Sequence, residues 1–366
     1  MKKILKISAV ALIIIITGVG GYSAWIYLIA PGLGSSAPEL TQEQTGGSLI
    51  SPSLQALSKQ VIFDYWLKNN EIYAVALTGE IYRISLSGQE EKVFNQEIQN
   101  LSQVKASADG SKAIISFGYP AKETFVIFDT ANKSWQPLPA EIIAAAWSPR
   151  DSGQLAVLRE NNGQTTISIY NLASKKMVDI LRLNQQDLQI DWATPDEIYL
   201  VERPTNETPT SIWAVHITKK TIRSLIKEEA GLIVKWFNNG QSGLKFSRKQ
   251  NNTNILEVVN KNNQNEVVLP IISLPEKCAV GDKNLYCGSS LSFNNGSLPD
   301  DYLKGKRFLP DSLYQIPIGL ENLSLTVYDA DIEDVALDIW RPEIKKDRLI
   351  FINRFNRQLY LLDLNL

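Results

Sequence analysis

The sequence has little of the chemistry from which most active sites are built. Its 366 residues include one histidine, His216, and two cysteines, Cys278 and Cys287. A zinc site of the usual Cys and His type would need almost all of them to converge. A Ser-His-Asp triad would have to use His216, which lies in the alternating run SIWAVHIT and is expected to be an ordinary strand residue. We therefore predict no catalytic residue, no metal site and no cofactor.

An excess of charge of one sign is also missing. The formal net charge is -2, so no long-range field attracts nucleic acid or acidic polymers. Basic residues do not cluster with aromatic residues as a nucleic-acid groove would require. Nucleic-acid binding is not expected. With 44% hydrophobic and 21% charged residues, the composition is that of a globular protein with a large buried core.

One long apolar run stands near the N-terminus. Residues 7–30 contain no charged side chain and as a helix could cross a hydrocarbon core of about 30 Å. Lysines in residues 1–6 favour a cytoplasmic N-terminus, so we expect a single-pass cell-membrane protein that is extracytoplasmic after about Pro31. A cleaved signal peptide is the alternative, although its apolar region normally spans about 7 to 15 residues. Residues 31–48, rich in Gly, Pro, Ser and Gln, are expected to form a flexible linker.

Residues 144–181 form a unit with which the rest of the sequence after the linker can be compared. They hold four strand-like runs, AAAW, QLAVLRE, TISIYNL and MVDIL, separated by turn residues, and so predict a four-stranded antiparallel meander. One meander cannot bury both of its faces and must stack on copies of itself. The copies recur at about 40 to 45 residues, the period of one propeller blade. The position of Trp147 is matched in the other units by Trp66, Ala106, Trp192, Trp236, Val280 and Trp340.

The predicted fold is an all-β, seven-bladed β-propeller over residues 49–366. Short apolar bursts broken by Gly, Asn, Asp and Pro do not fit a helical period. The last unit, VALDIW, RLIFINR and QLYLLDL, has no fourth strand. We expect Leu49 to Leu57 to supply that strand and to close the ring, which removes two open sheet edges. Pro52 is acceptable in an outermost strand.

The run WSPRDSGQLAVL, with SADGSKAIISF before it, resembles the repeats of TolB-like and dipeptidyl-peptidase-type propellers, from about residue 60 to the end. In such peptidases a hydrolase domain follows the propeller. Here none follows, and no Gly-x-Ser-x-Gly elbow is present, so the resemblance implies the propeller without that catalytic part. The segments LPEKCAVGDKNLYC, SLPDDYLKGKRFLPDSLYQI and DRLIFINRFNRQLYLLDL are similar to uncharacterised single-pass, membrane-anchored propeller proteins of candidate-phylum bacteria. That second likeness indicates topology and source more than function.

The two cysteines are predicted to form a disulfide. They flank a hairpin turn at Asp282-Lys283 and stand opposite each other as a non-hydrogen-bonded pair. An extracytoplasmic location permits their oxidation. Free thiols are the alternative.

The sixth unit carries an insertion, GSSLSFNNGSLPDDYLKGKRFLPDS, in which Phe293, Tyr302 and Phe308 are candidate binding residues. It should lie on the face that carries the second-to-third turns and the links between blades. Loops on a rigid scaffold often bind ligands, but the insertion could equally be a lid whose aromatic residues pack over the ring.

Two further motifs have simple interpretations. Asp329, Asp331, Glu333 and Asp334 could hold calcium, but the loop lacks the glycine and the distal Glu of an EF-hand, and solvated charge is favoured. The sequon at Asn206 matters only in a host that glycosylates.

Three hypotheses for function remain. The first is a membrane-tethered, extracytoplasmic scaffold of the bacterial envelope that binds or assembles proteins and has no catalysis of its own. The second is a carbohydrate or cell-wall ligand binder that uses aromatic residues near the central channel. The third is a carboxylate-dependent hydrolase, which a pair of acidic residues converging at the channel mouth would favour.

Overall fold

The computed structural model describes residues 53–161, 163–237, 239–290, 298–319, 324–331 and 334–364. The chain divides into two compact units, Met1–Leu49 and Ile50–Leu366, and the described residues all belong to the second. The expected basic tail, membrane helix and linker lie outside the described residues. Within the described part, no helix has both the length and the apolar character needed to span a membrane.

The described chain is built from antiparallel sheets, and in all but one of them the strand order follows the sequence. The first three are four-stranded: β2 (Ile62–Lys68), β3 (Glu71–Ala76), β4 (Ile81–Ser85) and β5 (Glu90–Phe94); β6 (Leu101–Ala106), β7 (Lys112–Phe117), β8 (Thr124–Asp129) and β9 (Ser134–Pro137); and β10 (Ile142–Trp147), β11 (Gln154–Asn161), β12 (Gln164–Asn171) and β13 (Lys176–Leu183). A seven-stranded sheet comes next: β14 (Leu188–Asp191), β15 (Glu197–Glu202), β16 (Thr210–His216), β17 (Thr221–Phe237), β18 (Ser242–Arg248), β19 (Asn254–Asn260) and β20 (Asn265–Val268).

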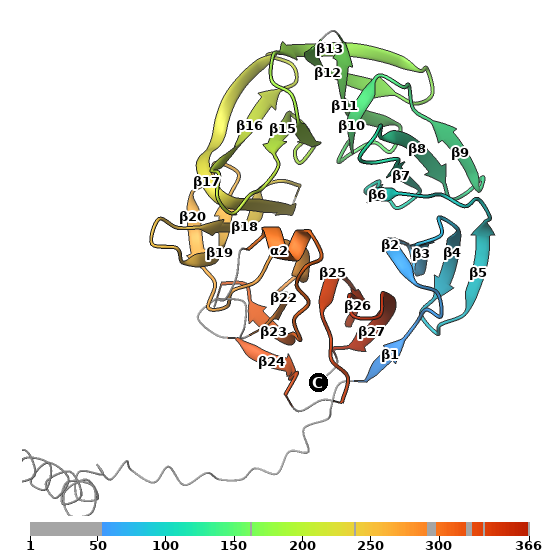
Figure 1. Cartoon of the computed structure of the whole chain (residues 1–366), viewed down its shortest axis with the longest axis vertical. Helices are drawn as coiled ribbons and strands as arrows, with labels where there is room; N and C mark the ends of the chain where they lie inside the picture. The colour runs from blue at the N-terminus through green and yellow to red at the C-terminus, as the bar shows by residue number, and fades with distance from the viewer. Residues whose placement is uncertain are drawn as a thin grey trace, which may run out of the picture. The chain divides into compact units, whose positions relative to one another are not determined.

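The remaining strands form two more four-stranded sheets. One contains β21 (Cys278–Val280), β22 (Asn284–Ser289), β23 (Ser312–Pro317) and β24 (Leu325–Tyr328); the other contains β25 (Ile339–Lys345), β26 (Arg348–Asn353), β27 (Gln358–Asp363) and β1 (Leu54–Ala56). A 3-10 turn, η3 (Pro275–Lys277), precedes β21, and a short helix, α2 (Asp300–Leu303), lies between β22 and β23. The sheets stand around a central axis (Figure 1).

The seven-stranded sheet contains two meanders that share β17. This strand has 17 residues. Its first part pairs with β16 and its last part with β18. The strand is therefore outermost in one meander and innermost in the next, so the four-stranded pattern continues through it.

The predicted closing strand is confirmed over the residues that the structure describes. Leu54, Gln55 and Ala56 of β1 pair with β27, although the two strands stand at opposite ends of the chain. Beyond the strand, Leu57 donates its N–H to the Leu359 carbonyl at 2.8 Å, and its side chain is only 2% exposed. The first and last sheets are thus joined by main-chain bonds and by a buried leucine.

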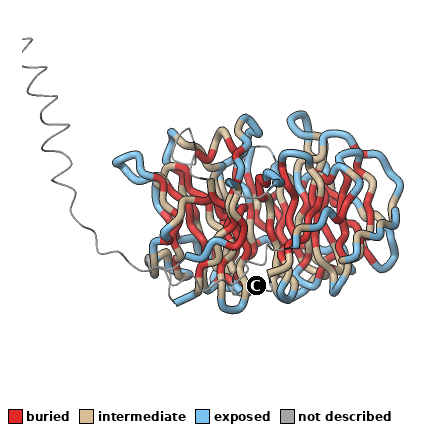
Figure 2. Tube along the Cα trace, turned by 90° about the horizontal axis from the view of Figure 1, so that it is seen from below, coloured by how far each residue is buried: buried red, intermediate tan, exposed pale blue. Residues whose placement is uncertain are grey.

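The hydrophobic core lies between neighbouring sheets. Ile62 and Ile72 of the first sheet, for example, pack with Ile350 and Leu359 of the last. Figure 2 shows buried residues within the strands and exposed residues in the turns at both ends. This distribution is the expected one for blades that bury both faces against their neighbours.

The strand register corrects the repeat alignment in the first unit. Trp147 pairs with Leu155, the second residue of its partner strand β11. In the first unit the residue paired with Ile72, the second residue of β3, is Leu67 rather than Trp66. The sequence alignment chose Trp66 because it is a large aromatic residue like Trp147, and it was wrong by one position.

A larger shift occurs in the last unit. Ile344 pairs with Leu349, the second residue of β26, whereas Trp340 pairs with Ile352 near the far end of that strand. A bulge at Arg341 and the following proline lengthens β25. The structural equivalent of Trp147 is therefore Ile344, and the alignment with Trp340 is wrong.

Candidate functional site

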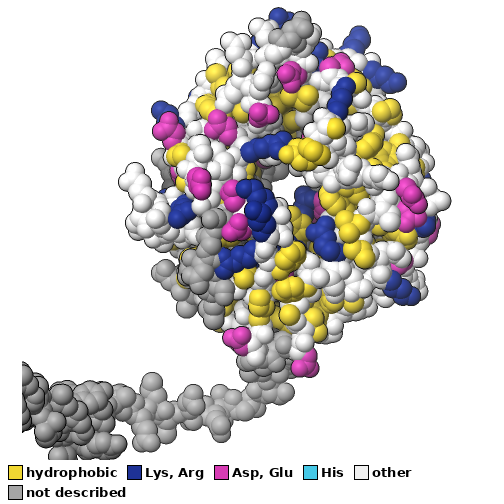
Figure 3. Space-filling view, in the orientation of Figure 1, with side chains coloured by type: hydrophobic (Ala, Val, Ile, Leu, Met, Phe, Trp, Pro, Cys, Tyr) yellow, Lys and Arg dark blue, Asp and Glu magenta, His cyan; other side chains and the backbone are white. Residues whose placement is uncertain are grey.

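The first strand of each meander borders a central opening, here called the channel. These innermost strands are β2, β6, β10, β14, the last part of β17, β21 and β25 (Figure 1). Each pairs with a neighbour on one edge only, so its other edge carries main-chain groups without a ladder partner. Figure 3 shows the opening with Lys and Arg side chains at its rim.

Ionisable residues recur at one place in the repeat. The residue directly before the equivalent of Trp147, here called the channel position, is Lys105 in β6, Asp191 in β14, Lys235 in β17 and Glu343 in β25. All four side chains remain partly exposed although they lie on innermost strands. They therefore face the open channel.

Two lysines at the channel position donate to the next strands around the ring. The Lys105 ammonium lies 3.4 Å from the Ala145 carbonyl oxygen and 3.3 Å from that of Ile190. The Lys235 ammonium donates to the Cys278 carbonyl at 2.7 Å. Each of these three carbonyls lies two residues before the equivalent of Trp147. The lysines therefore donate hydrogen bonds to carbonyls at the same repeat position, which have no partner in the sheet.

Arg341 is the third cation of the channel. It lies in the β25 bulge with a positive φ of 50°, a conformation that few residues other than glycine adopt. Its guanidinium forms an ion pair with Asp64 of β2 and lies 3.4 Å from the Val104 carbonyl of β6. The bulge thus directs this side chain across two neighbouring sheets, while 37% of it stays exposed.

Three carboxylates in the channel differ from these cations in their partners. They are Asp191, Glu343 and Glu276, the last of which comes from η3. The positive charge of Lys105 lowers the pKa of Asp191, and that of Lys235 lowers the pKa of both glutamates. Among the described residues, however, no cation lies within salt-bridge distance of any of the three, and Oε2 of Glu276 is buried without a hydrogen-bond partner.

Burial shifts the pKa values of the channel acids and lysines in opposite directions. Burial raises the pKa of the Asp191, Glu276 and Glu343 carboxyls, and the nearby lysines only partly oppose the shift. Burial also lowers the pKa of the Lys105 and Lys235 ammonium groups. A loss of solvation penalises charge of either sign, which is what these opposite shifts indicate. The carboxylates would gain from a ligand that brings positive charge and N–H donors.

The three candidate binding residues of the insertion differ in their exposure and in whether the structure describes them. Tyr302 is only 1% exposed, and its ring lies between the Arg354 guanidinium, 3.7 Å from the ring centre, and the Lys277 ammonium at 4.6 Å. Phe308 is 46% exposed and lies 6.3 Å from the ring of Phe355. Phe293 lies outside the described residues. Of the two candidates that the structure describes, Tyr302 packs as the lid alternative expects, and Phe308 is open to a ligand.

A buried charged cluster holds the insertion on the ring. Lys277 bridges Asp311 at 2.6 Å and Asp338 at 2.7 Å. The Tyr302 hydroxyl donates to Asp338 at 3.2 Å, and Arg354 bonds the same carboxylate and the Tyr302 carbonyl. Since Arg354 belongs to a second-to-third turn, the insertion lies on the predicted face.

The disulfide prediction is confirmed. Cys278 and Cys287 are bonded, and their Cα atoms lie 4.1 Å apart across the β21–β22 hairpin. This spacing fits a non-hydrogen-bonded cross-strand pair. Because the Cys278 carbonyl accepts from Lys235, the bridge also fixes part of the channel wall.

The other sequence candidates show no reactive geometry. His216 ends β16, and its Nδ1 accepts from the Lys219 N–H. Glu333 lies outside the described residues, and within the described part no acidic, His or Cys group is placed to hold a metal. The Asn206 side-chain oxygen accepts from Arg248.

Sequence reasoning missed the channel position. Lys105, Asp191 and Lys235 each directly precede a correctly aligned repeat position, so the charge at that position was a visible signal. Glu343 was hidden by the misplaced alignment with Trp340. Nothing in the local sequence of Glu276 places it in the channel, because the turn that carries it lies outside the repeat.

Comparisons with solved structures identify the fold. An oligogalacturonate lyase of Vibrio parahaemolyticus matches with a TM-score of 0.57 at 11% identity, over 86% of this chain and 97% of the lyase. The β-propeller domain of the trilobed protease of Pyrococcus furiosus, described as having an open velcro topology, matches with a TM-score of 0.51 at 12% identity, over 82% and 95%.

A third structural neighbour is TolB of Acinetobacter baumannii, with a TM-score of 0.43 and 12% identity over 82% of this chain. The chain spans 62% of that protein's length. No family model and no curated protein sequence matches the chain. The two neighbours with TM-scores above 0.5 are propeller-type proteins, one of them a lyase, and at these identities they show the fold alone.

Proposed function

We propose that residues 49–366 form a seven-bladed β-propeller that acts as a non-catalytic binding scaffold for a protein partner. Five four-stranded sheets, together with the two meanders that share β17, support the count of seven blades. The pairing of β1 with β27 supports a closed ring. A rigid ring with loops at both ends is suited to presenting a binding surface.

The observation that carries the binding role is the imbalance of partners in the channel. The cations Lys105, Lys235 and Arg341 are hydrogen-bonded to main-chain carbonyls. The carboxylates of Glu276 and Glu343, in contrast, lack a cation within salt-bridge distance among the described residues. The chemistry that completes this site is an ammonium or guanidinium group. A lysine, an arginine or the amino terminus of a partner protein would supply it.

The proposal places the propeller outside the cytoplasmic membrane of a bacterium, tethered by residues 7–30. The apolar run and the lysines before it support this orientation. The disulfide between Cys278 and Cys287 also supports it, because such bonds persist mainly in oxidising compartments. The likeness to membrane-anchored propellers of candidate-phylum bacteria agrees with the same placement.

A basic peptide tests the channel. A tetra-arginine peptide should bind the full chain in detergent, and Glu343→Gln or Glu276→Gln should weaken binding by about tenfold, the effect of losing one charge-assisted hydrogen bond. Because both carboxyls have raised pKa values and a bound cation favours the ionised form, affinity should rise from pH 5 to pH 8. Isothermal titration calorimetry measures both effects.

Glu160→Gln is the matched control, since Glu160 is an exposed residue at the end of β11. It should leave the affinity unchanged. Equal weakening by all three substitutions would place the peptide outside the channel and remove the basis of the proposal. Crosslinking in native membranes followed by mass spectrometry would then identify the natural partner.

Carbohydrate binding is the second candidate, and a specific surface favours it. Phe308 and Phe355 are 46% and 45% exposed and lie 6.3 Å apart, with the Arg354 guanidinium 4.6 Å from the Phe308 ring. Exposed aromatic faces of this kind suit sugar rings. Trp66 and Trp147, in contrast, are buried between sheets. A glycan array with Phe308→Ala as the control distinguishes this candidate from the first.

A carboxylate-dependent hydrolase is the third candidate. Glu276 and Glu343 both interact electrostatically with Lys235. Both carboxyls have raised pKa values, as a general acid requires. Hydrolysis of a glycan or peptide that depends on these two glutamates would favour it over a binding scaffold.

A further inference from the structure

The first and last sheets enclose a second polar hollow, here called the seam pocket. It has a volume of about 290 Å³ and is lined by Asn70, Leu86, Lys345, Lys346, Asp347 and Arg348. The four charged residues form the hairpin between β25 and β26, while Asn70 and Leu86 belong to turns of the first sheet. The pocket therefore lies between the first and last sheets, where the ring closes.

Like charges are crowded along one wall of the seam pocket. Lys345 and Arg348 are direct cross-strand partners, an arrangement that destabilises a hairpin when both residues carry the same charge. Lys346 adds a third positive charge beside them. An anion bound among these groups would relieve the repulsion.

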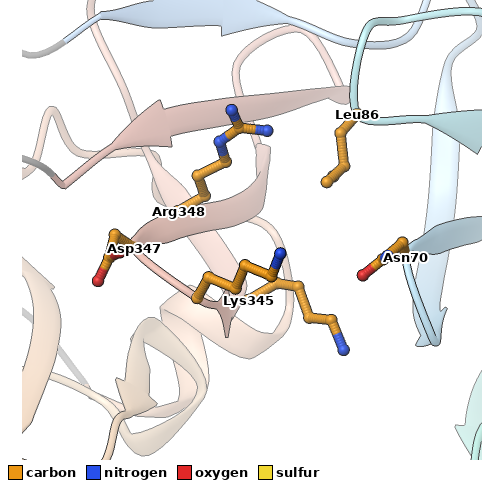
Figure 4. Close-up of a pocket in the computed structure, with 6 residues that line it drawn as sticks. Asn70, Leu86, Lys345, Asp347 and Arg348 are labelled. Carbon is orange, nitrogen blue, oxygen red and sulfur yellow. The ribbon is translucent and has the colours of Figure 1, made fainter.

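The carboxylates near the seam pocket leave an excess of positive charge on its wall. Asp347 points away from the hollow (Figure 4) and acts electrostatically on Tyr286 of β22. Glu71, next to Asn70, forms an ion pair with Arg83 at 2.8 Å. Asp363 of β27 is the direct cross-strand partner of Arg348, so the excess of positive charge rests on Lys345 and Lys346.

The opposite wall supplies a polar and an apolar contact. Figure 4 shows the Asn70 amide and the Leu86 side chain directed into the gap that faces Lys345 and Arg348. A guanidinium fork with ammonium groups beside it suits the several oxygens of a phosphate, which can carry a double negative charge. The volume leaves room beyond the phosphate for an esterified group against Leu86.

We propose that the seam pocket binds a phosphate monoester. The ester is either a soluble metabolite, such as a sugar phosphate, or the phosphate headgroup of a lipid. Since the binding groups come from both the first and the last sheet, the ligand holds the ring closed. This site is independent of the channel and of the partner proposed for it.

The first probe is inorganic phosphate added to the full chain in detergent, at constant ionic strength. We expect a saturable rise in melting temperature relative to chloride. Arg348→Gln should weaken phosphate binding by about tenfold, the cost of losing a bidentate charged contact. Lys346→Gln, at an exposed turn residue, should weaken phosphate binding in the same direction.

The matched control is Lys175→Gln with Lys176→Gln. These lysines are exposed and lie at the equivalent end of the molecule: Lys175 is in the turn between β12 and β13, and Lys176 is the first residue of β13. Removing them changes the net charge by the same sign. Their loss should leave phosphate binding unchanged. Absence of a saturable effect, or equal weakening by the control and pocket variants, would overturn the proposal.

Two esters then identify the source of the ligand. Glucose 6-phosphate and a short-chain phosphatidic acid are compared in the same detergent. Binding of either ester more tightly than inorganic phosphate, with loss in Arg348→Gln, supports the site and names the soluble or the lipid source. Esters that bind tightly but equally to the Arg348→Gln variant would contradict it.

Discussion

At the scale of single residues, Asp311 links the stability of the fold to pH. Burial raises its pKa from 3.8 to about 7, a shift that the Lys277 ammonium opposes and the Asp338 carboxylate reinforces. Between these values the folded state keeps a proton that the unfolded chain has released. The contribution of Asp311 to the free energy of unfolding is complete below about pH 4 and is lost as the pH rises through about 7.

The melting temperature should therefore fall between pH 5 and pH 8, and Asp311→Asn should reduce that fall by on the order of 5 °C. An asparagine oxygen can still accept the Ile339 N–H, which Asp311 binds at 2.8 Å. Calorimetry at several pH values measures the effect, with the exposed Asp282→Asn as the control. A pH profile unchanged by Asp311→Asn would contradict the assignment of the fall to Asp311.

At the scale of the elements, the short strand β1 should matter more than its length suggests. A chain that starts at Lys59 loses the pairing with β27 and the buried Leu57, and should be less stable by several kcal/mol than one that starts at Gly47. Leu57→Ala alone should cost about 2 to 5 kcal/mol. Denaturant unfolding measures both. Leu77→Ala, at a residue that is 48% exposed, should change stability little, and equal stability of the two chain lengths would refute the role of β1.

The elements show where sequence reasoning works and where it stops. Turn chemistry and alternation are local properties, so the meanders and the Cys278–Cys287 hairpin could be predicted from them. The closing strand could be predicted because the repeat count left the last unit one strand short. The register of β25 could not, because the bulge at Arg341 depends on contacts with Asp64 and Val104, which lie in neighbouring sheets but are far away in the sequence. The insertion illustrates the same limit: composition identifies Tyr302 and Phe308 as candidates alike, but only the buried cluster around Asp338 decides which one is covered.

At the scale of the whole molecule, the orientation across the membrane is a prediction that a fusion can test. A reporter placed after Leu366 should be active only when it reaches the outside of the cytoplasm, because the lysines before residues 7–30 hold the N-terminus inside. The same reporter placed before Met1 should give the opposite result. Activity of a cytoplasm-dependent reporter at the C-terminal position would reverse the proposed topology and remove the envelope from the proposed function.

The position of β1 also has a mechanical meaning. The strand comes directly after the proposed tether in sequence and is the element that closes the ring on β27. If a bound partner pulls against the tether, tension enters the propeller at this three-residue strand before it reaches any other sheet. The bonds of β1 with β27 and the burial of Leu57 are therefore the first structure to bear the load. The ring would open between its first and last sheets. Force on the tether would pull these two sheets apart, whereas a ligand in the seam pocket would hold them together.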